Sequence, residues 1–493
     1  MTEFSQTGVA VDVEAVPMAG QTAIRVGEHE RLKRQELGAA DIAGSTMANI
    51  GPAMSFYFGF GFIAFTAGVA SPLTFVVAAI AIGFLGYTMS QFSRVHPSAG
   101  SFITYIGKAF GPTAAIACVI VLMTGFVFAI LGAIGVTGGF TAIFINHYAH
   151  GFPTSVWPAI TIAFFAFGAY LMYRGVRIST KWITAFFIFE FIVIVLVSIL
   201  AIIDNRTHLT LHPFNPHYLS SGFKGLGLGF PLAIFCFLGW ENSVALAEET
   251  DNPRRKIPRA LFLSILLMMG TFVLMAYATV EGFKENVTNL SSAPIPFISV
   301  AQNVLGVAAF FAYLAGVTST VSCWMAAANS QTRIMFNAGR EGLLPRWLGR
   351  VHPTHKTPYH ATLAFLCVAL CLVFIWVWSR HETPQAMFAE TSTLGTIMII
   401  LIYFVATLAL PVFFLKHYRS QFNVVKHLIV PILGAAAIIF PMYQLVKPGQ
   451  PSPYNYFPYA ALGVVVVGVV YAVILNRRDK TLADRVGSIV ADE

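Results

Sequence analysis

Residues 49–53 read Asn49-Ile50-Gly51-Pro52-Ala53 and lie in the middle of an apolar stretch that covers residues 40–67. Proline lacks a backbone N–H and clashes with the preceding helical turn, while glycine adopts conformations closed to other residues. A helix through this stretch therefore has to break near Gly51. In a membrane, such a break is tolerated only where protein or a wet cavity surrounds it.

A second interruption occurs in the apolar stretch 224–248, where the sequence reads Phe237-Leu238-Gly239-Trp240-Glu241-Asn242-Ser243. Paired interruptions at corresponding positions of two halves are typical of secondary transporters, which bind their substrate at the breaks. The spacing predicts a transport core over 39–411, built from two five-helix inverted repeats (39–203 and 224–411), with peripheral helices over 412–475. For either interruption alone, a simple kink is the alternative.

The composition places the rest of the chain in a membrane as well. Of the 493 residues, 57% are hydrophobic and 11% are charged, against about 25% charged residues in soluble domains. The mean hydropathy is +0.72. An all-α membrane protein with about twelve transmembrane helices is predicted, because each span needs about 20 mainly apolar residues. The expected spans are 40–67, 72–92, 112–145, 156–173, 180–203, 224–248, 258–281, 303–335, 359–379, 386–411, 427–446 and 455–475.

The distribution of positive charge predicts the orientation. With the N-terminus inside, only five of the 30 Lys and Arg residues fall in outer loops: Arg206, Lys224, Lys284, Arg380 and Lys447. Cytoplasmic loops carry such an excess of Lys and Arg, so we expect a multi-pass protein of the cell (inner) membrane with cytoplasmic tails over 1–38 and 476–493. The same bias accounts for the net charge of +8 without a nucleic-acid partner.

Nothing in the sequence indicates an enzyme, a metal site or a cofactor. The five cysteines lie in apolar stretches without disulfide or metal-ligand spacing, and the 13 histidines are scattered. Neither an HExxH nor a GxSxG motif is present. Small buried residues are the simplest interpretation of the cysteines.

Two acidic residues lie deep in apolar stretches: Glu190, within FFIFEFIVIV, and Glu241, in the second interruption. A charge at the bilayer centre costs at least about 2.5–3.5 kcal/mol, so such residues indicate a functional site by default. A carboxyl that gains and loses a proton as solvent access alternates is a natural coupling element. The structural alternative is a carboxyl that hydrogen-bonds to a neighbouring helix.

At three places the sequence resembles the amino acid–polyamine–organocation transporter superfamily. The first is the stretch 97–105 between the second and third spans, which is similar to the proline–glycine–tyrosine signature of that family. The second follows the sixth span, and the third follows the eighth. The residues that carry these last two are Leu246-Ala247-Glu248-Glu249-Thr250-Asp251-Asn252-Pro253, Ile257-Pro258-Arg259-Ala260, Arg333, Gly339-Arg340-Glu341-Gly342, Leu344-Pro345, Val351-His352 and Thr357-Pro358.

The resemblance implies a five-plus-five inverted-repeat (LeuT-like) fold that holds its substrate between helices 1, 3, 6, 8 and 10. Backbone N–H groups of the first break would receive a substrate carboxylate, and carbonyls of the second break would receive its amine. It also implies a coupling role for Glu241 and a gating role for Phe235. Glu190 falls where proton-coupled relatives carry a lysine, near the second sodium site of sodium-coupled members, so a proton-coupling role and a cation-binding role are both open for this carboxyl. The implied substrate-binding residues are Asn49, Ile50, Gly51, Pro52, Ala53, Met54, Phe237, Leu238, Gly239, Trp240 and Glu241.

The first break departs from the usual Ile-Gly-x-Gly pattern of that family at Pro52 and Ala53. Proline cannot donate a hydrogen bond, and Ala53 adds a methyl group. Either fewer backbone donors hold the carboxylate of the substrate, or the substrate has no carboxylate. Amines and polyamines therefore remain candidate substrates beside amino acids.

The predicted function is secondary active transport of an amino acid or related amine by alternating access, with protons as the coupling ion. The alternatives are a polyamine or monoamine importer, an amino acid/amine exchanger, and a nutrient receptor that binds without transport. A monomer or homodimer in the lipid bilayer is expected.

Overall fold

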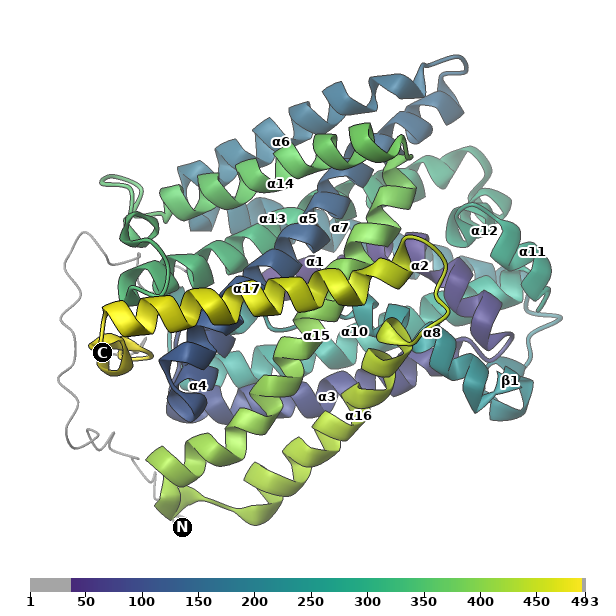
Figure 1. Cartoon of the computed structure of the whole chain (residues 1–493). Coiled ribbons are helices and arrows are strands. Elements are labelled where there is room, and N and C mark those ends of the chain that lie inside the picture. The colour runs from purple at the N-terminus through teal and green to yellow at the C-terminus, as the bar shows by residue number, and fades with distance from the viewer. Residues whose placement is uncertain (1–36, 490–493) are drawn as a thin grey trace, which may run out of the picture.

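The computed structural model describes residues 37–489, so most of the predicted N-terminal tail and the end of the C-terminal tail lie outside the described residues. Within this range the chain is helical apart from short connections and one three-residue strand, β1 (Ser220–Gly222). Eleven helices in the described range are long and apolar enough to cross a membrane. The all-α membrane fold predicted from the sequence is confirmed (Figure 1).

The helices follow the predicted spans closely. Many of them begin with proline, whose fixed φ suits the first helical position, where its missing N–H is not needed. The first seven are α1 (Ala39–Ile50), α2 (Pro52–Ala67), α3 (Pro72–Val95), α4 (Ser101–Phe110), α5 (Pro112–Tyr148), α6 (Trp157–Arg174) and α7 (Val176–Asp204). The others are α8 (Phe223–Cys236), α9 (Asn242–Ala245), α10 (Pro253–Gly282), α11 (Val287–Ser292), α12 (Pro296–Leu305), α13 (Phe310–Glu341), α14 (Tyr359–Arg380), α15 (Pro384–His417), α16 (Val430–Val446), α17 (Phe457–Arg478) and α18 (Leu482–Arg485).

The stretch 224–248 is interrupted as predicted, because α8 ends at Cys236 and α9 begins only at Asn242. One predicted span has bounds that differ from the observed helices. The predicted span 303–335 joins two elements: the chain turns at Gly306, after α12, and α13 then continues to Glu341. Apolar runs alone do not mark such turns, so the sequence placed the start and end of this span incorrectly.

The first interruption breaks the helix at a single residue. Gly51 adopts φ 58° and ψ 65°, and its N–H closes α1 by bonding to Ala48 O at 3.0 Å and Met47 O at 3.3 Å. Pro52 then starts α2. A Cβ at Gly51 would stand 2.9 Å from Cys323 Cβ. Both the left-handed backbone and this close approach therefore require glycine.

The second interruption lies directly against the first. Gly239 adopts φ 104°, and its carbonyl accepts a hydrogen bond from Asn49 Nδ2 at 3.4 Å. The two breaks, far apart in the sequence, thus form one region of irregular backbone inside the bundle. Residues on both sides of each break are buried, as a break at membrane depth requires.

The outermost helices carry the apolar surface. Large side chains on α6, α14 and α17, among them Ile162, Leu363 and Val466, are at least 50% exposed. A soluble monomer rarely exposes contiguous apolar surface on this scale. Figure 1 shows these helices along the outside of the bundle, where lipid would cover them.

We call one end of the bundle the basic end; it comprises the loops 95–101, 174–176, 246–253 and 341–359 and the segment 479–489. It lies at the left in Figure 1, opposite α11, α12 and β1. A buried ion pair joins Arg333 of α13 to Glu249, with Nη2 3.1 Å from Oε1 and a second contact through Nε. Arg340, about two turns further along the same face of α13, pairs with Glu248 through Nη1 and Nη2.

Residues after α17 cover part of this end. Leu482 and Val486 are buried, and the Gly487 N–H donates to Glu341 Oε1 at 3.0 Å. The Gly487 carbonyl lies 3.1 Å from His96 Nε2. Burial and the neighbouring Lys108 ammonium lower the pKa of His96 to about 3, so the ring is neutral and donates from Nε2 to this carbonyl.

Candidate functional site

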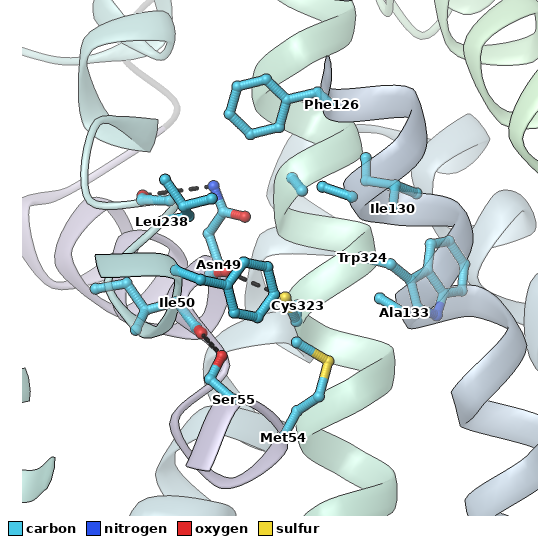
Figure 2. Close-up of a pocket in the computed structure, with 14 residues that line it drawn as sticks. Asn49, Ile50, Met54, Ser55, Phe126, Ile130, Ala133, Leu238, Cys323 and Trp324 are labelled. Atoms are coloured by element: carbon cyan, nitrogen blue, oxygen red, sulfur yellow. Dashed lines mark hydrogen bonds between the residues drawn. The ribbon is translucent and has the colours of Figure 1, made fainter. Parts of the chain in front are cut away.

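A narrow cavity lies where the two breaks meet, with the mostly apolar lining that is typical of small-molecule sites. Its walls come from the first break, from α5, from α8 with the residues that follow it, and from α13 (Figure 2). The lining residues are Asn49, Ile50, Met54, Ser55, Phe126, Ala129, Ile130, Ala133, Phe235, Leu238, Gly239, Cys323, Trp324 and Ala327.

Three polar side chains of the lining, Asn49, Ser55 and Cys323, already hydrogen-bond to the backbone of the first or the second break. Besides the Asn49 amide bond to Gly239, the Ser55 hydroxyl donates to Ile50 O at 2.8 Å and the Cys323 thiol donates to Asn49 O at 3.1 Å. These bonds are visible in Figure 2. They hold the irregular backbone in place and leave apolar side chains to form most of the wall.

Six of the sequence-predicted site residues line this cavity together: Asn49, Ile50, Met54, Phe235, Leu238 and Gly239. The remaining predicted binding residues are buried but are not part of the lining: Gly51, Pro52, Ala53, Phe237, Trp240 and Glu241. Phe237 packs against Phe272 with ring centroids 5.2 Å apart, and Trp240 packs against Tyr403 at 5.5 Å. The second break therefore turns Leu238 toward the cavity and the side chains of Phe237, Trp240 and Glu241 away from it.

The lining from α5 and α13 has no local signal in the sequence. Phe126, Ala129, Ile130 and Ala133 share one helical face by their i, i+3, i+4 and i+7 spacing, but apolar residues surround them on every side. Cys323, Trp324 and Ala327 lie within an equally apolar span. Only the resemblance, which implies helices 3 and 8 beside the substrate, pointed to these walls.

Glu190 lies beside the start of α2 and is fully buried. Its carboxyl faces the Ser319 hydroxyl and the Ala53 N–H, without a hydrogen bond of ordinary geometry to either. Ser319 in turn accepts the Met54 N–H at 3.0 Å. The carboxyl thus faces the positive end of the α2 dipole. It does not line the cavity itself but lies next to Ser319, which contacts the lining residue Met54.

Glu241 is buried on the other side of the second break. Its carboxyl faces the Tyr403 hydroxyl of α15, not the cavity. The two acidic residues singled out in the sequence therefore lie in separate surroundings, and neither lines the cavity formed by the breaks.

A family model described as amino acid permease matches residues 37–470. The chain belongs to the amino acid permease family. It is therefore a membrane transporter, as the superfamily resemblance implied.

Curated relatives cover most of this permease. The branched-chain amino acid permease BcaP of Bacillus subtilis is 26% identical over 469 residues, which cover 90% of this chain and 95% of that protein. The methylthioribose transporter of Bacillus subtilis is 25% identical over 409 residues, or 77% and 81% of the two chains. The low-affinity putrescine importer PlaP of Escherichia coli is 24% identical over 313 residues, or 61% and 66%.

Substitution of Gly239 by Ala is expected to disrupt the site of the permease. An added Cβ would stand 2.7 Å from the side-chain Cγ of Asn49 and 2.8 Å from the backbone carbonyl carbon of the same residue. The φ of 104° at Gly239 would also strain an alanine. Because the two breaks would have to separate, we expect uptake of substrate to fall at least about tenfold, equivalent to about 1.4 kcal/mol. Radiolabelled uptake into proteoliposomes, normalised to folded protein, measures the change.

Gly449→Ala provides the matched control, because Gly449 also has a positive φ (89°) but no atom within 4 Å of an added Cβ. It should lose little uptake. Equal uptake by both variants would show that contact between the breaks is unimportant for transport.

Proposed function

We propose that this permease carries a small amino acid with an uncharged, apolar side chain across the membrane by alternating access. The observation that carries the proposal is the cavity wall. Among residues 37–489, no acidic or basic side chain lines the cavity, and Phe126, Ile130, Phe235 and Leu238 supply its surface. Such a wall suits an apolar side chain and offers no counter-charge to a second amine, which would be costly to bury unpaired.

Backbone atoms of the breaks are proposed to hold the charged amino acid head group. The α2 N-terminus attracts a carboxylate through its dipole, although Pro52 removes one donor and Ser319 occupies that of Met54. The carbonyls of the second break attract the amine. The predicted site residues of the two breaks keep their proposed roles, with Phe235 as a gate at the cavity wall.

We further propose that protons drive the transport and that Glu190 carries the coupling proton. Its carboxyl lies behind the α2 start, so occupancy of the substrate site and movement of α2 would change its surroundings directly. The basic end is proposed to face the cytoplasm, and the two halves of the core (39–203 and 224–411) to move as inverted repeats. The lysine and arginine distribution supports that orientation.

The second candidate is an amine or polyamine importer. The substitutions at Pro52 and Ala53, which weaken the carboxylate site, favour it, as does similarity to a putrescine importer. The lack of an acidic side chain in the lining weighs against it.

A ligand screen on the purified protein separates these proposals. We expect leucine, isoleucine or alanine to raise the unfolding temperature, because a ligand at 100 times its Kd stabilises the folded state by about 2.7 kcal/mol. Arginine and putrescine should have no effect. Stabilisation by putrescine alone would replace the amino acid proposal with the amine one, and uptake into proteoliposomes with the stabilising ligand distinguishes a transporter from a receptor.

A further inference from the structure

The helix α6 does not line the cavity but packs behind its wall, where Gly168 and Phe165 contact Trp324. Most of its residues are exposed or partly exposed, and its buried residues are Thr161, Gly168, Leu171 and Met172. A Cβ at Gly168 would overlap Trp324 Cη2 and stand 2.8 Å from Cζ2. The tip of the Trp324 ring thus occupies the space left by the missing side chain of Gly168.

Packing alone holds the Trp324 ring in this position. The side chain is 1% exposed, and its ring stacks on Phe165 of α6 with centroids 6.1 Å apart. A buried indole N–H usually has a hydrogen-bond partner, yet Trp324 Nε1 has none among residues 37–489. No polar contact in the described structure therefore opposes a shift of the ring.

The position of this ring sets the width of the cavity on the α13 side. Trp324 belongs to the lining, and Figure 2 shows its ring on the far side of the cavity from Asn49, beside the helix that carries Ala133. Because the ring extends away from the two breaks and into the space at Gly168, the cavity keeps room for a substrate side chain. A side chain at residue 168 would push the ring back toward the breaks.

We infer that Gly168, which touches no substrate, determines the largest side chain that the permease accepts, by positioning the Trp324 ring. The inference rests on the proposed transport of apolar amino acids and adds a specificity determinant outside the cavity. Close helix packing through a small residue is the alternative role for such a glycine; that role affects stability and not the choice of substrate.

The test compares uptake of leucine and alanine by Gly168→Ala in proteoliposomes. One methyl group in an apolar pocket is worth about 10–200-fold in selectivity, so we expect the KM for leucine to rise at least about tenfold relative to the KM for alanine. Maximal rates should change little. Gly270→Ala is the matched control, because Gly270 is also helical and has no atom within 4 Å of an added Cβ.

A second substitution separates positioning from packing. Trp324→Phe shortens the ring, so Gly168→Ala combined with Trp324→Phe should restore the leucine-to-alanine ratio of KM values. Trp324→Phe alone should admit larger side chains and lower the KM for phenylalanine relative to leucine, and it tests the inference even if Gly168→Ala does not fold.

The inference fails if Gly168→Ala is folded and keeps the wild-type ratio, or if Trp324→Phe leaves the ratio for phenylalanine and leucine unchanged. Failure of the proposed function is a different result: the wild-type protein would then take up none of these amino acids.

Discussion

Substitution of Glu190 by Gln is expected to abolish proton-driven accumulation of substrate, while exchange of internal for external substrate continues. The amide has nearly the shape of the carboxyl but cannot bind and release a proton. With one proton carried per substrate, a gradient of one pH unit corresponds to about 1.4 kcal/mol and supports about tenfold accumulation. In the variant, the accumulation ratio should fall to about one at every pH.

The position of Glu190 makes this variant informative. The carboxyl is fully buried and faces Ala53 at the start of α2, where the helix dipole favours negative charge. An alternating-access movement that shifts α2 removes that dipole from the carboxyl. We expect this change to couple proton release to the position of the first break.

Glu281→Gln is the matched control for a buried carboxyl in a membrane helix. Glu281 of α10 is 2% exposed and accepts from the Thr210 N–H at 3.3 Å, a contact that glutamine can keep. Its accumulation should match the wild-type protein. Full accumulation by Glu190→Gln would end the coupling proposal, and loss of both exchange and accumulation would instead indicate a structural carboxyl.

The second large effect is expected at the basic end, where Glu249→Ala should lower the free energy of unfolding by about 3–5 kcal/mol. Both side chains of the Glu249–Arg333 pair are 2% exposed, so the substitution leaves a buried guanidinium without its carboxylate. The unfolding temperature in detergent micelles measures the loss.

Asp251→Ala provides the comparison from the same loop. Asp251 pairs with Lys256 at 2.6 Å, but these side chains are 57% and 28% exposed, and exposed pairs contribute about 0–1 kcal/mol. Removing both charges of the buried pair, with Glu249→Leu and Arg333→Met, should recover part of the lost stability. Identical melting of Glu249→Ala and Asp251→Ala would contradict the assigned importance of the buried pair.

The sequence predicted the helical membrane fold because span length and apolar content are local properties. It also predicted the two breaks, since Gly51-Pro52 and Gly239 are local helix-breaking signals. It could not predict that Asn49 bonds to Gly239, because that contact depends on how two distant spans pack. For the same reason, it could not predict that the Glu241 carboxyl faces the Tyr403 hydroxyl of α15.

The walls of the site were the least predictable part. Phe126 and Trp324 differ in no local respect from other aromatic residues of apolar spans. Their place in the wall depends on the rotations of α5 and α13, which are set by packing against helices that are distant in the sequence. Membrane helices are apolar on all sides, so the hydrophobic pattern that reveals the buried face of a soluble helix is weak in them.

The segment that covers the basic end has a consequence for biosynthesis. Residues 482–487 leave the ribosome after α17, yet they bury groups on α13 and in the loop after α3, which are made much earlier. Until then, His96 and Glu341 lack the backbone partner that Gly487 supplies. A chain that stops at Arg478 therefore leaves these two side chains without their Gly487 bonds, and the finished permease differs from its late biosynthetic intermediate at this end.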